Sequence, residues 1–169
     1  MKQIKLAFII GILSGGFVFQ SASQETLPEV KVVAVRYKYL MSVDNKDLAQ
    51  PVKLLERQAA TFDVKSSEYY QDDYDNYFIS FFIPEGQILA AYDKDGKLLH
   101  TAEKYKNVAL PAVVRQSVTT RFPGWVIAKD FYVVSYEEAK GSRKVYKILL
   151  ENGDKRIKVK TNDKGEFLD

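Results

Sequence analysis

The sequence has 169 residues, with 25 basic and 22 acidic side chains, a formal net charge of +3 and no cysteine. This length fits one ordinary domain with a sizeable core. The near balance of charges excludes a whole-protein field that attracts nucleic acid. Without cysteine, the chain has no disulfides, no thiol chemistry and no thiolate metal site.

Residues 1–23 have the pattern of a cleaved secretory signal. Lys2 and Lys5 precede an apolar stretch, and Ser21 and Ser23 stand three residues and one residue before the cut. The apolar stretch is shorter than the roughly 20 residues that a spanning helix needs, although a retained membrane anchor is the alternative. We therefore expect an exported protein, periplasmic or secreted, of a Gram-negative-type envelope, with no transmembrane anchor after cleavage. Without the two lysines, the net charge falls from +3 to +1.

The first half of the remaining chain predicts a strand, a helix and a hairpin. Glu29–Leu40 mixes valine and tyrosine with charges at short intervals, which predicts a strand. Pro51–Phe62 has apolar residues at helical spacing and proline in its first turn, which predicts a helix. Tyr77–Ile83 and Gln87–Asp93 flank Pro-Glu-Gly and predict a hairpin, after which Asp93–Gly96 predicts a turn into a short strand.

The second half predicts a similar order of helix, long strand, hairpin and turn with a short strand. Proline again opens the helix, and here proline also follows it and ends it. An Asn-Gly pair at the hairpin is the strongest short signal for such a turn. These segments are Pro111–Phe122, Val126–Tyr136, the pair Val145–Leu150 and Lys155–Lys160, and Asn162–Leu168.

This recurrence predicts an internal duplication. Arg57-Gln58 and Arg115-Gln116 stand inside the two helices, and Asn162–Leu168 repeats the turn at Asp93–Leu99. We expect an α+β fold in which two tandem helix-plus-antiparallel-sheet units form one continuous sheet, with both helices on one face and the other face in water. The domain is residues 24–169, divided into units of about 27–101 and 102–169. We expect many of the eleven tyrosines on sheet faces rather than in the core.

One segment resembles a known family. The run LPAVVRQSVTTRFPGWVIAKDFYVV followed by YKILLENGDKRIKVKTNDKGEFL is similar to the PepSY-like family, also described as beta-lactamase-inhibitor-like. The resemblance covers Leu110–Leu168 well and Pro51–Leu99 more loosely, since Phe62-Asp63 replaces the Phe-Pro-Gly-Trp element. It implies an exported helix-and-sheet repeat that binds a protein or peptide on the open face of its sheet, with inhibition as one form of that binding.

The resemblance also brings an enzyme name, nicotinate-nucleotide adenylyltransferase, which the residues do not support. Such chemistry uses an H-x-G-H-type site whose imidazoles bind phosphate and stabilise transition-state charge. The sequence has one histidine, His100, with Glu103 as the nearby acid. We predict a surface histidine at a strand end, and neither a catalytic residue nor a cofactor site. An enzyme that uses His100 is the alternative.

Acidic residues cluster in the sequence EYYQDDYDNY, Glu68–Tyr77. Asp72, Asp73 and Asp75 are predicted to form a solvated loop rather than a calcium site, and we predict no metal site. The tyrosines of the same segment suit a protein interface, although they are equally consistent with ordinary strand positions. The candidate partner-binding residues are Tyr37, Tyr39, Tyr70, Tyr74, Trp125 and Tyr132.

A basic strand face is the second candidate surface. Arg156, Lys158 and Lys160 alternate with Ile157 and Val159, so the three basic side chains share one side of a strand. They predict either a grip on an acidic partner, lipid or polysaccharide, or the water side of a strand that discourages edge pairing. A structural envelope component that binds polysaccharide or lipid is thus a further alternative function.

Overall fold

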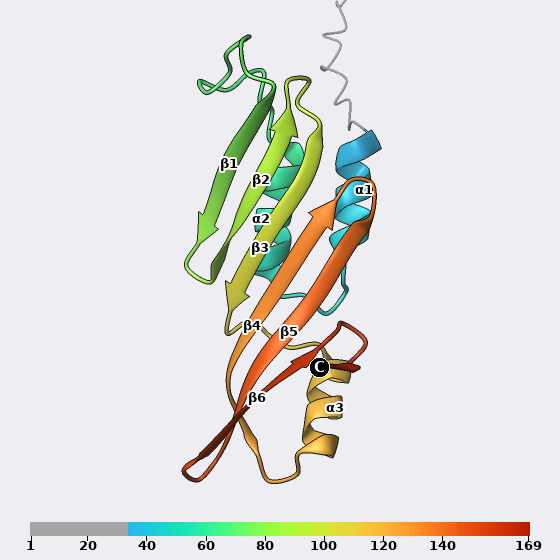
Figure 1. Cartoon of the computed structure of the whole chain (residues 1–169), viewed down its shortest axis with the longest axis vertical. Coiled ribbons are helices and arrows are strands. Elements are labelled where there is room, and N and C mark those ends of the chain that lie inside the picture. The colour runs from blue at the N-terminus through green and yellow to red at the C-terminus, as the bar shows by residue number, and fades with distance from the viewer. Residues whose placement is uncertain (1–33) are drawn as a thin grey trace, which may run out of the picture. The chain divides into compact units, whose positions relative to one another are not determined.

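The structure is a computed structural model that describes residues 34–169, with side chains from Tyr37 on (Figure 1). All these residues belong to one unit of the chain, residues 31–169, and the expected signal segment lies outside them. The helices are α1 Ala34–Val43, α2 Gln50–Thr61 and α3 Ala112–Arg121. The strands are β1 Asn76–Ile83, β2 Gly86–Asp93, β3 Leu98–Lys106, β4 Val126–Glu137, β5 Gly141–Asn152, β6 Lys155–Thr161 and β7 Phe167–Leu168.

The strands form a single sheet in chain order. Each strand from β1 to β7 pairs with the next one, and every pair is antiparallel. The α3 helix lies in the connection between β3 and β4. These features confirm the predicted α+β class. No helix within residues 34–169 combines the length and the apolar character that crossing a membrane requires.

Both predicted helices and both predicted hairpins occur. Pro51 stands in the first turn of α2, and Pro111 is the residue before α3, where its missing N–H leaves no donor unpaired. The hairpin of β5 and β6 turns at Gly153 and Asp154, one residue later than the Asn-Gly signal indicated, because Asn152 pairs with Lys155. Gly153 has a φ of 56°, which glycine adopts without steric cost.

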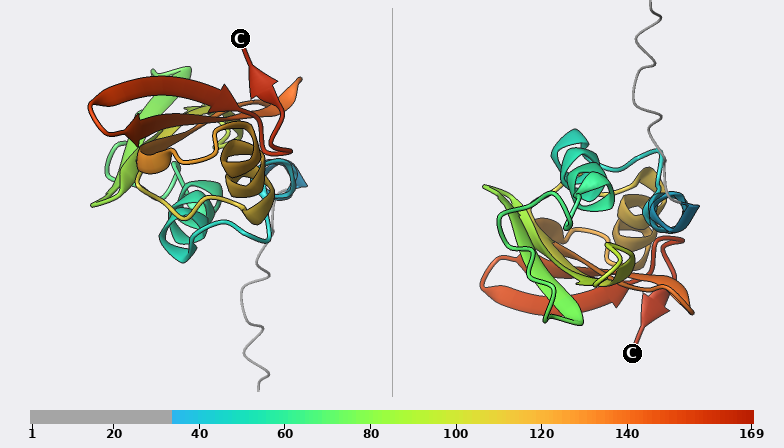
Figure 2. Two further views of the ribbon diagram at one scale, coloured as in Figure 1. Left: turned by 90° about the horizontal axis from the view of Figure 1, so that it is seen from below. Right: turned by 90° about the horizontal axis from the view of Figure 1, so that it is seen from above.

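The segment Glu29–Leu40 is not a strand in its described part, which corrects the sequence prediction. Its valines and tyrosines favour strand, but α1 places Tyr39 and Val43 four residues apart on one helical face, and both are fully buried. The helix contacts β3, β4 and β5, whereas α2 contacts β1 and β2. Figure 2 shows α1 and α2 beside the same face of the sheet. Tertiary packing therefore overrides local propensity here.

The face of the sheet that α1 and α2 contact, called the covered face below, holds most of the tyrosines. Seven of the eleven are buried, six on strands and Tyr39 on α1, which corrects the expectation that many lie on sheet faces rather than in the core. Tyr105, Tyr132 and Tyr146 stand opposite one another on β3, β4 and β5. Their rings stack at centroid distances of 6.0 Å and 4.6 Å. We call these three residues the tyrosine row.

Gly86 continues the tyrosine row onto β2, where it stands opposite Tyr105. A Cβ atom at this position would overlap the carbonyl oxygen of Lys104 and lie 2.7 Å from Cδ1 of Tyr105. Glycine thus leaves the space that the first ring of the row occupies.

Candidate binding face

Alternate residues of the strands point away from the helices and form an open face. On β1 and β2, this face carries Phe78, Phe82 and Leu89, whose exposed fractions are 67%, 67% and 42%. Phe78 stands opposite Ala91, which in turn stands opposite His100 on β3. Side chains of this size are normally buried, so a group of exposed ones on adjacent strands is characteristic of an interaction surface.

We call the part of the open face that carries Phe78, Phe82 and Leu89 the apolar half. A shallow hollow lies over it. Phe78, Leu89, Ala91, Ala102 and His100 are among its lining residues. His100 is exposed near the start of β3, as the sequence predicted, and it stands opposite Glu137 of β4. Among the described residues, its imidazole has no hydrogen-bond or ion-pair partner. The histidine therefore contributes a polar edge to an apolar surface.

The other half of the open face is basic. A hollow of about 550 Å³ is lined by five lysines from four strands, together with Phe131, Val133 and Leu149. We call it the lysine hollow. The Nζ atoms of Lys104 and Lys129 each lie 5.1 Å from the centroid of the Phe131 ring, which is a cation–π distance. The five lysines are Lys104, Lys129, Lys147, Lys158 and Lys160.

The predicted basic strand face is confirmed in its geometry, and the structure divides it. Arg156, Lys158 and Lys160 are exposed on β6 while Ile157 and Val159 are partly buried. Arg156 forms an ion pair with Glu151, with 2.8 Å between Nε and Oε1, and lies outside the lysine hollow. Lys158 and Lys160 belong to it. Lys104, Lys129 and Lys147 were missed because strand register, which brings them beside β6, is not readable from the sequence.

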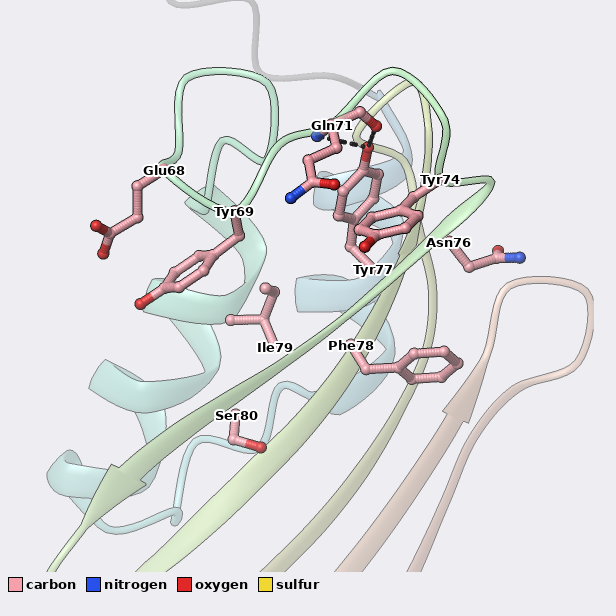
Figure 3. Close-up of a pocket in the computed structure, with 9 residues that line it drawn as sticks. All are labelled: Glu68, Tyr69, Gln71, Tyr74, Asn76, Tyr77, Phe78, Ile79 and Ser80. Atoms are coloured by element: carbon pink, nitrogen blue, oxygen red, sulfur yellow. Dashed lines mark hydrogen bonds between the residues drawn. The ribbon is translucent and has the colours of Figure 1, made fainter.

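The tyrosine-rich loop before β1 borders a separate pocket of about 680 Å³ (Figure 3). The hydroxyl of Tyr77 donates to the backbone oxygen of Gln71 at 2.6 Å and so fixes the loop to β1. Tyr70 is half-buried and stacks on Tyr77 at 5.8 Å, whereas Tyr74 is 50% exposed. Figure 3 shows Tyr69 and Ile79 on the α2 side of β1 and Phe78 on the other side. The loop thus presents tyrosine at the edge of the sheet.

The six candidate partner-binding residues do not form one group. Tyr39 of α1 and Tyr132 of β4 are fully buried between the helices and the sheet. A partner cannot reach them, contrary to expectation. Tyr37 is 58% exposed but belongs to α1, and Trp125 is partly buried against the core. Tyr70 and Tyr74 lie in the loop before β1. The loop is therefore the place where two of the six residues are neighbours and neither is fully buried.

The acidic residues of this loop stay on the surface. Asp72, Asp73 and Asp75 are all exposed. Within residues 34–169, no three acidic or histidine side chains are grouped closely enough to hold a metal ion.

Two glutamates are buried between the helices and the covered face. The sequence did not single out Glu56, and it offered Glu103 only as the acid near His100. Glu56 of α2 is 3% exposed and Glu103 of β3 is 2% exposed. Tyr39 and Thr101 donate to Oε1 of Glu103 at 2.8 Å and 2.7 Å, and Tyr105 donates to Oε2 at 3.0 Å. Helical spacing offered a signal for Glu56, which lies four residues after the buried Val52.

Burial dominates the electrostatics of this pair. It raises the pKa of Glu103, although three hydrogen bonds act in the opposite direction. Burial and the nearby charge of Glu103 together raise the pKa of Glu56 to about 9. Glu56 is therefore a neutral acid at neutral pH. Because both carboxyl groups are closed off from solvent, they belong to the core rather than to a binding surface.

Comparison with known proteins gives no match: neither a family model, nor a curated protein, nor a solved structure corresponds to this chain.

Proposed function

We propose that the protein is an exported, non-enzymatic binding protein that engages a protein or peptide through the open face of its sheet. One observation carries the proposal: Phe78 and Phe82 are each 67% exposed on one strand, beside the exposed Leu89 of the next strand. Keeping such side chains in water has no benefit for folding, and interfaces are where proteins bury them. Inhibition of an enzyme is one form that this binding takes in the proposal.

The proposal includes a duplicated, PepSY-like architecture with α2 and α3 on one face of the sheet. Two turns support it. The Oδ1 atom of Asp93 accepts the N–H groups of Asp95 and Lys97, both at 2.9 Å, and Oδ1 of Asn162 accepts those of Lys164 and Glu166, both at 3.0 Å. The fourth residue of each turn is a glycine with positive φ, 76° at Gly96 and 79° at Gly165.

The helices support the same architecture. The buried residues of α2 and the buried Val114 and Val118 of α3 belong to one hydrophobic core. The boundary between the two units, at residues 101 and 102, falls inside β3. On this proposal, β3 joins the two units within one sheet. In the second unit a strand, β4, follows the helix α3, whereas in the first unit a loop follows the helix α2 and leads to β1.

The decisive experiment compares two surface variants in partner capture. The full chain is expressed in a Gram-negative bacterium, purified as processed, and used to capture proteins from envelope extract. Phe78→Ser/Phe82→Ser removes the apolar half of the open face. Leu54→Ser is the matched control, because Leu54 is 60% exposed on α2. We expect the double variant to lose the captured protein and the control to retain it. Equal capture by both variants would exclude the open face.

The loop before β1 is tested separately. Tyr74→Ala removes an exposed ring, and Tyr70→Ala removes a half-buried one. If the loop forms part of the interface, the double variant weakens capture while the apolar half still binds. Unchanged affinity would remove the loop from the proposed interface.

A further inference from the structure

We propose that the lysine hollow binds an acidic peptide segment that has a central apolar side chain between carboxylates. This inference deepens the proposed function and rests on it, because it assigns a ligand chemistry to the other half of the same open face. Three features of the hollow support it: the placement of the lysines, the absence of acidic residues from its lining, and its apolar floor.

The lysines are placed against one another rather than against acids. Lys147 of β5 stands directly opposite Lys160 of β6, while Leu149 is flanked by Lys129 on one side and Lys158 on the other. Like charges opposite each other across a sheet are destabilising. None of the residues that line the hollow is acidic. The arrangement is thus unfavourable in the free protein and favourable once an anionic group binds between the lysines.

Three lysines outside the hollow illustrate the alternative, in which a lysine is paired with an acid. Lys65 lies 3.3 Å from Asp95, Lys97 lies 3.3 Å from Glu138 and Lys140 lies 2.6 Å from Glu137. Within residues 34–169, none of the five lysines of the hollow forms an ion pair. In the same part of the chain, lysines without an ion pair also occur singly elsewhere on the surface, but in the hollow five of them gather around one set of apolar residues.

The floor of the hollow is apolar. Phe131 is half-buried beneath Lys104 and Lys129, and Val133 and Leu149 lie beside it. An adjoining hollow shares Lys104 and Phe131 and includes Phe82 and Glu85. The lysine hollow is therefore continuous with the apolar half of the open face. A ligand that satisfies both features carries an apolar group for the floor and carboxylates for the lysines around it.

A peptide fits this description better than a membrane surface. The aromatic side chain within the lysine hollow, Phe131, is half-buried, whereas membrane-binding proteins insert projecting apolar side chains between lipids. The projecting Phe78 and Phe82 lie on β1, outside the residues that line the hollow. A peptide of this kind also agrees with the net charge of +1 for the chain without residues 1–23, because a local cluster of lysines recognises a ligand over a short range. Anionic lipid is thus the competing outcome of the test.

The test measures peptide binding by fluorescence anisotropy. The full chain is expressed in a Gram-negative bacterium, and the protein is purified in the form that the host produces. The probe is a labelled peptide with a central phenylalanine between glutamates, and the control peptide has lysine in place of every glutamate. Lys147→Gln/Lys160→Gln alters the hollow. Lys65→Gln/Lys140→Gln is the matched control, since both residues are exposed lysines elsewhere. We expect the hollow variant to bind the glutamate peptide about tenfold more weakly and the control variant to bind it as the wild type does.

Three results would overturn the proposal: no binding of the glutamate peptide, equal binding of the lysine peptide, or equal affinity of the hollow variant. Flotation with phosphatidylglycerol vesicles provides the second arm. Vesicle binding that the hollow variant loses, without peptide binding, would overturn the proposal and assign the hollow to lipid. If the peptide fails while Phe78→Ser/Phe82→Ser still abolishes partner capture, the inference falls and the proposed function stands. Thermal unfolding of each variant verifies that it is folded.

Discussion

The hydroxyl of Tyr39 donates a 2.8 Å hydrogen bond to Oε1 of Glu103, and this bond joins α1 to the centre of the sheet. Both residues are buried, so the carboxylate has no water to replace a lost donor. This hydrogen bond helps to explain why a segment whose local composition favours a strand forms a helix, because the helix places the Tyr39 hydroxyl beside the buried carboxyl group of Glu103.

Tyr39→Phe is expected to destabilise the protein by about 1–3 kcal/mol, because it leaves a buried carboxylate oxygen with one donor fewer. The free energy of unfolding in urea measures the effect. Tyr37→Phe is the control on the same helix, since Tyr37 is 58% exposed. Equal stability of both variants would mean that the hydrogen bond contributes nothing.

Removing the hydroxyl group is expected to affect the stability of the protein differently at two members of the tyrosine row. Tyr105 donates to Oε2 of Glu103 at 3.0 Å, so Tyr105→Phe should destabilise by about 1–3 kcal/mol. The hydroxyl of Tyr132 is buried and has no hydrogen-bond partner within the described residues. Tyr132→Phe should therefore leave stability unchanged or raise it, since it removes an unsatisfied polar group. The free energy of unfolding in urea, measured for both variants, tests this expectation. A larger loss of stability from Tyr132→Phe than from Tyr105→Phe would contradict it.

Glu56 predicts how stability depends on pH. An unfolded glutamate has a pKa of about 4.3, whereas the folded-state pKa of Glu56 is about 9. Between these values the folded state holds a proton that the unfolded state has released. The contribution of Glu56 to the stability of the folded state is therefore fully present below about pH 4.3 and is lost as the pH rises towards about 9. The loss amounts to at most about 1.4 kcal/mol per pH unit.

Glu56→Gln is expected to remove this pH dependence, because glutamine keeps the shape and stays neutral. Urea unfolding between pH 5 and pH 8.5 should show a flatter profile than the wild type and greater stability at the alkaline end (a window set by the two values of about 4.3 and about 9). Glu68→Gln, at an exposed residue, is the control and should keep the wild-type slope. A wild-type slope in Glu56→Gln would show that another group is responsible.

Gly86→Ala tests the space beside the tyrosine row. The added methyl group would overlap the carbonyl oxygen of Lys104 and lie 2.7 Å from Cδ1 of Tyr105, so β2 or the ring must shift. We expect a loss of about 1–3 kcal/mol, typical of overpacking in a core. Near-ultraviolet circular dichroism should report a changed tyrosine environment. Tyr105→Leu and the double variant Gly86→Ala/Tyr105→Leu separate the two contacts. If Gly86→Ala costs less in the Tyr105→Leu background than in the wild type, the ring is the obstacle.

The helices and hairpins were predictable because their signals are local. Proline at the start of α2 and α3, and the Asn-Gly pair before β6, act within a few residues. The α1 helix was not predictable, since its stability depends on distant strands, as the hydrogen bond from Tyr39 to Glu103, 64 residues later, illustrates. The open face needed the register of six strand pairs, which no single segment contains. Lys158 and Lys160 were found because they belong to one strand, and Lys147 was missed because its role depends on its position opposite Lys160.

The order of the strands in the sheet, which equals their order along the chain, has a consequence for folding. Each strand pairs with the strand just before it, so each ladder closes only the connection between two successive strands, and loop-closure entropy grows with the length of that connection. A chain that crosses a membrane unfolded, as the proposed export requires, emerges from one end to the other. In this protein every new strand meets its partner as soon as it appears, and no strand has to wait for the last residue.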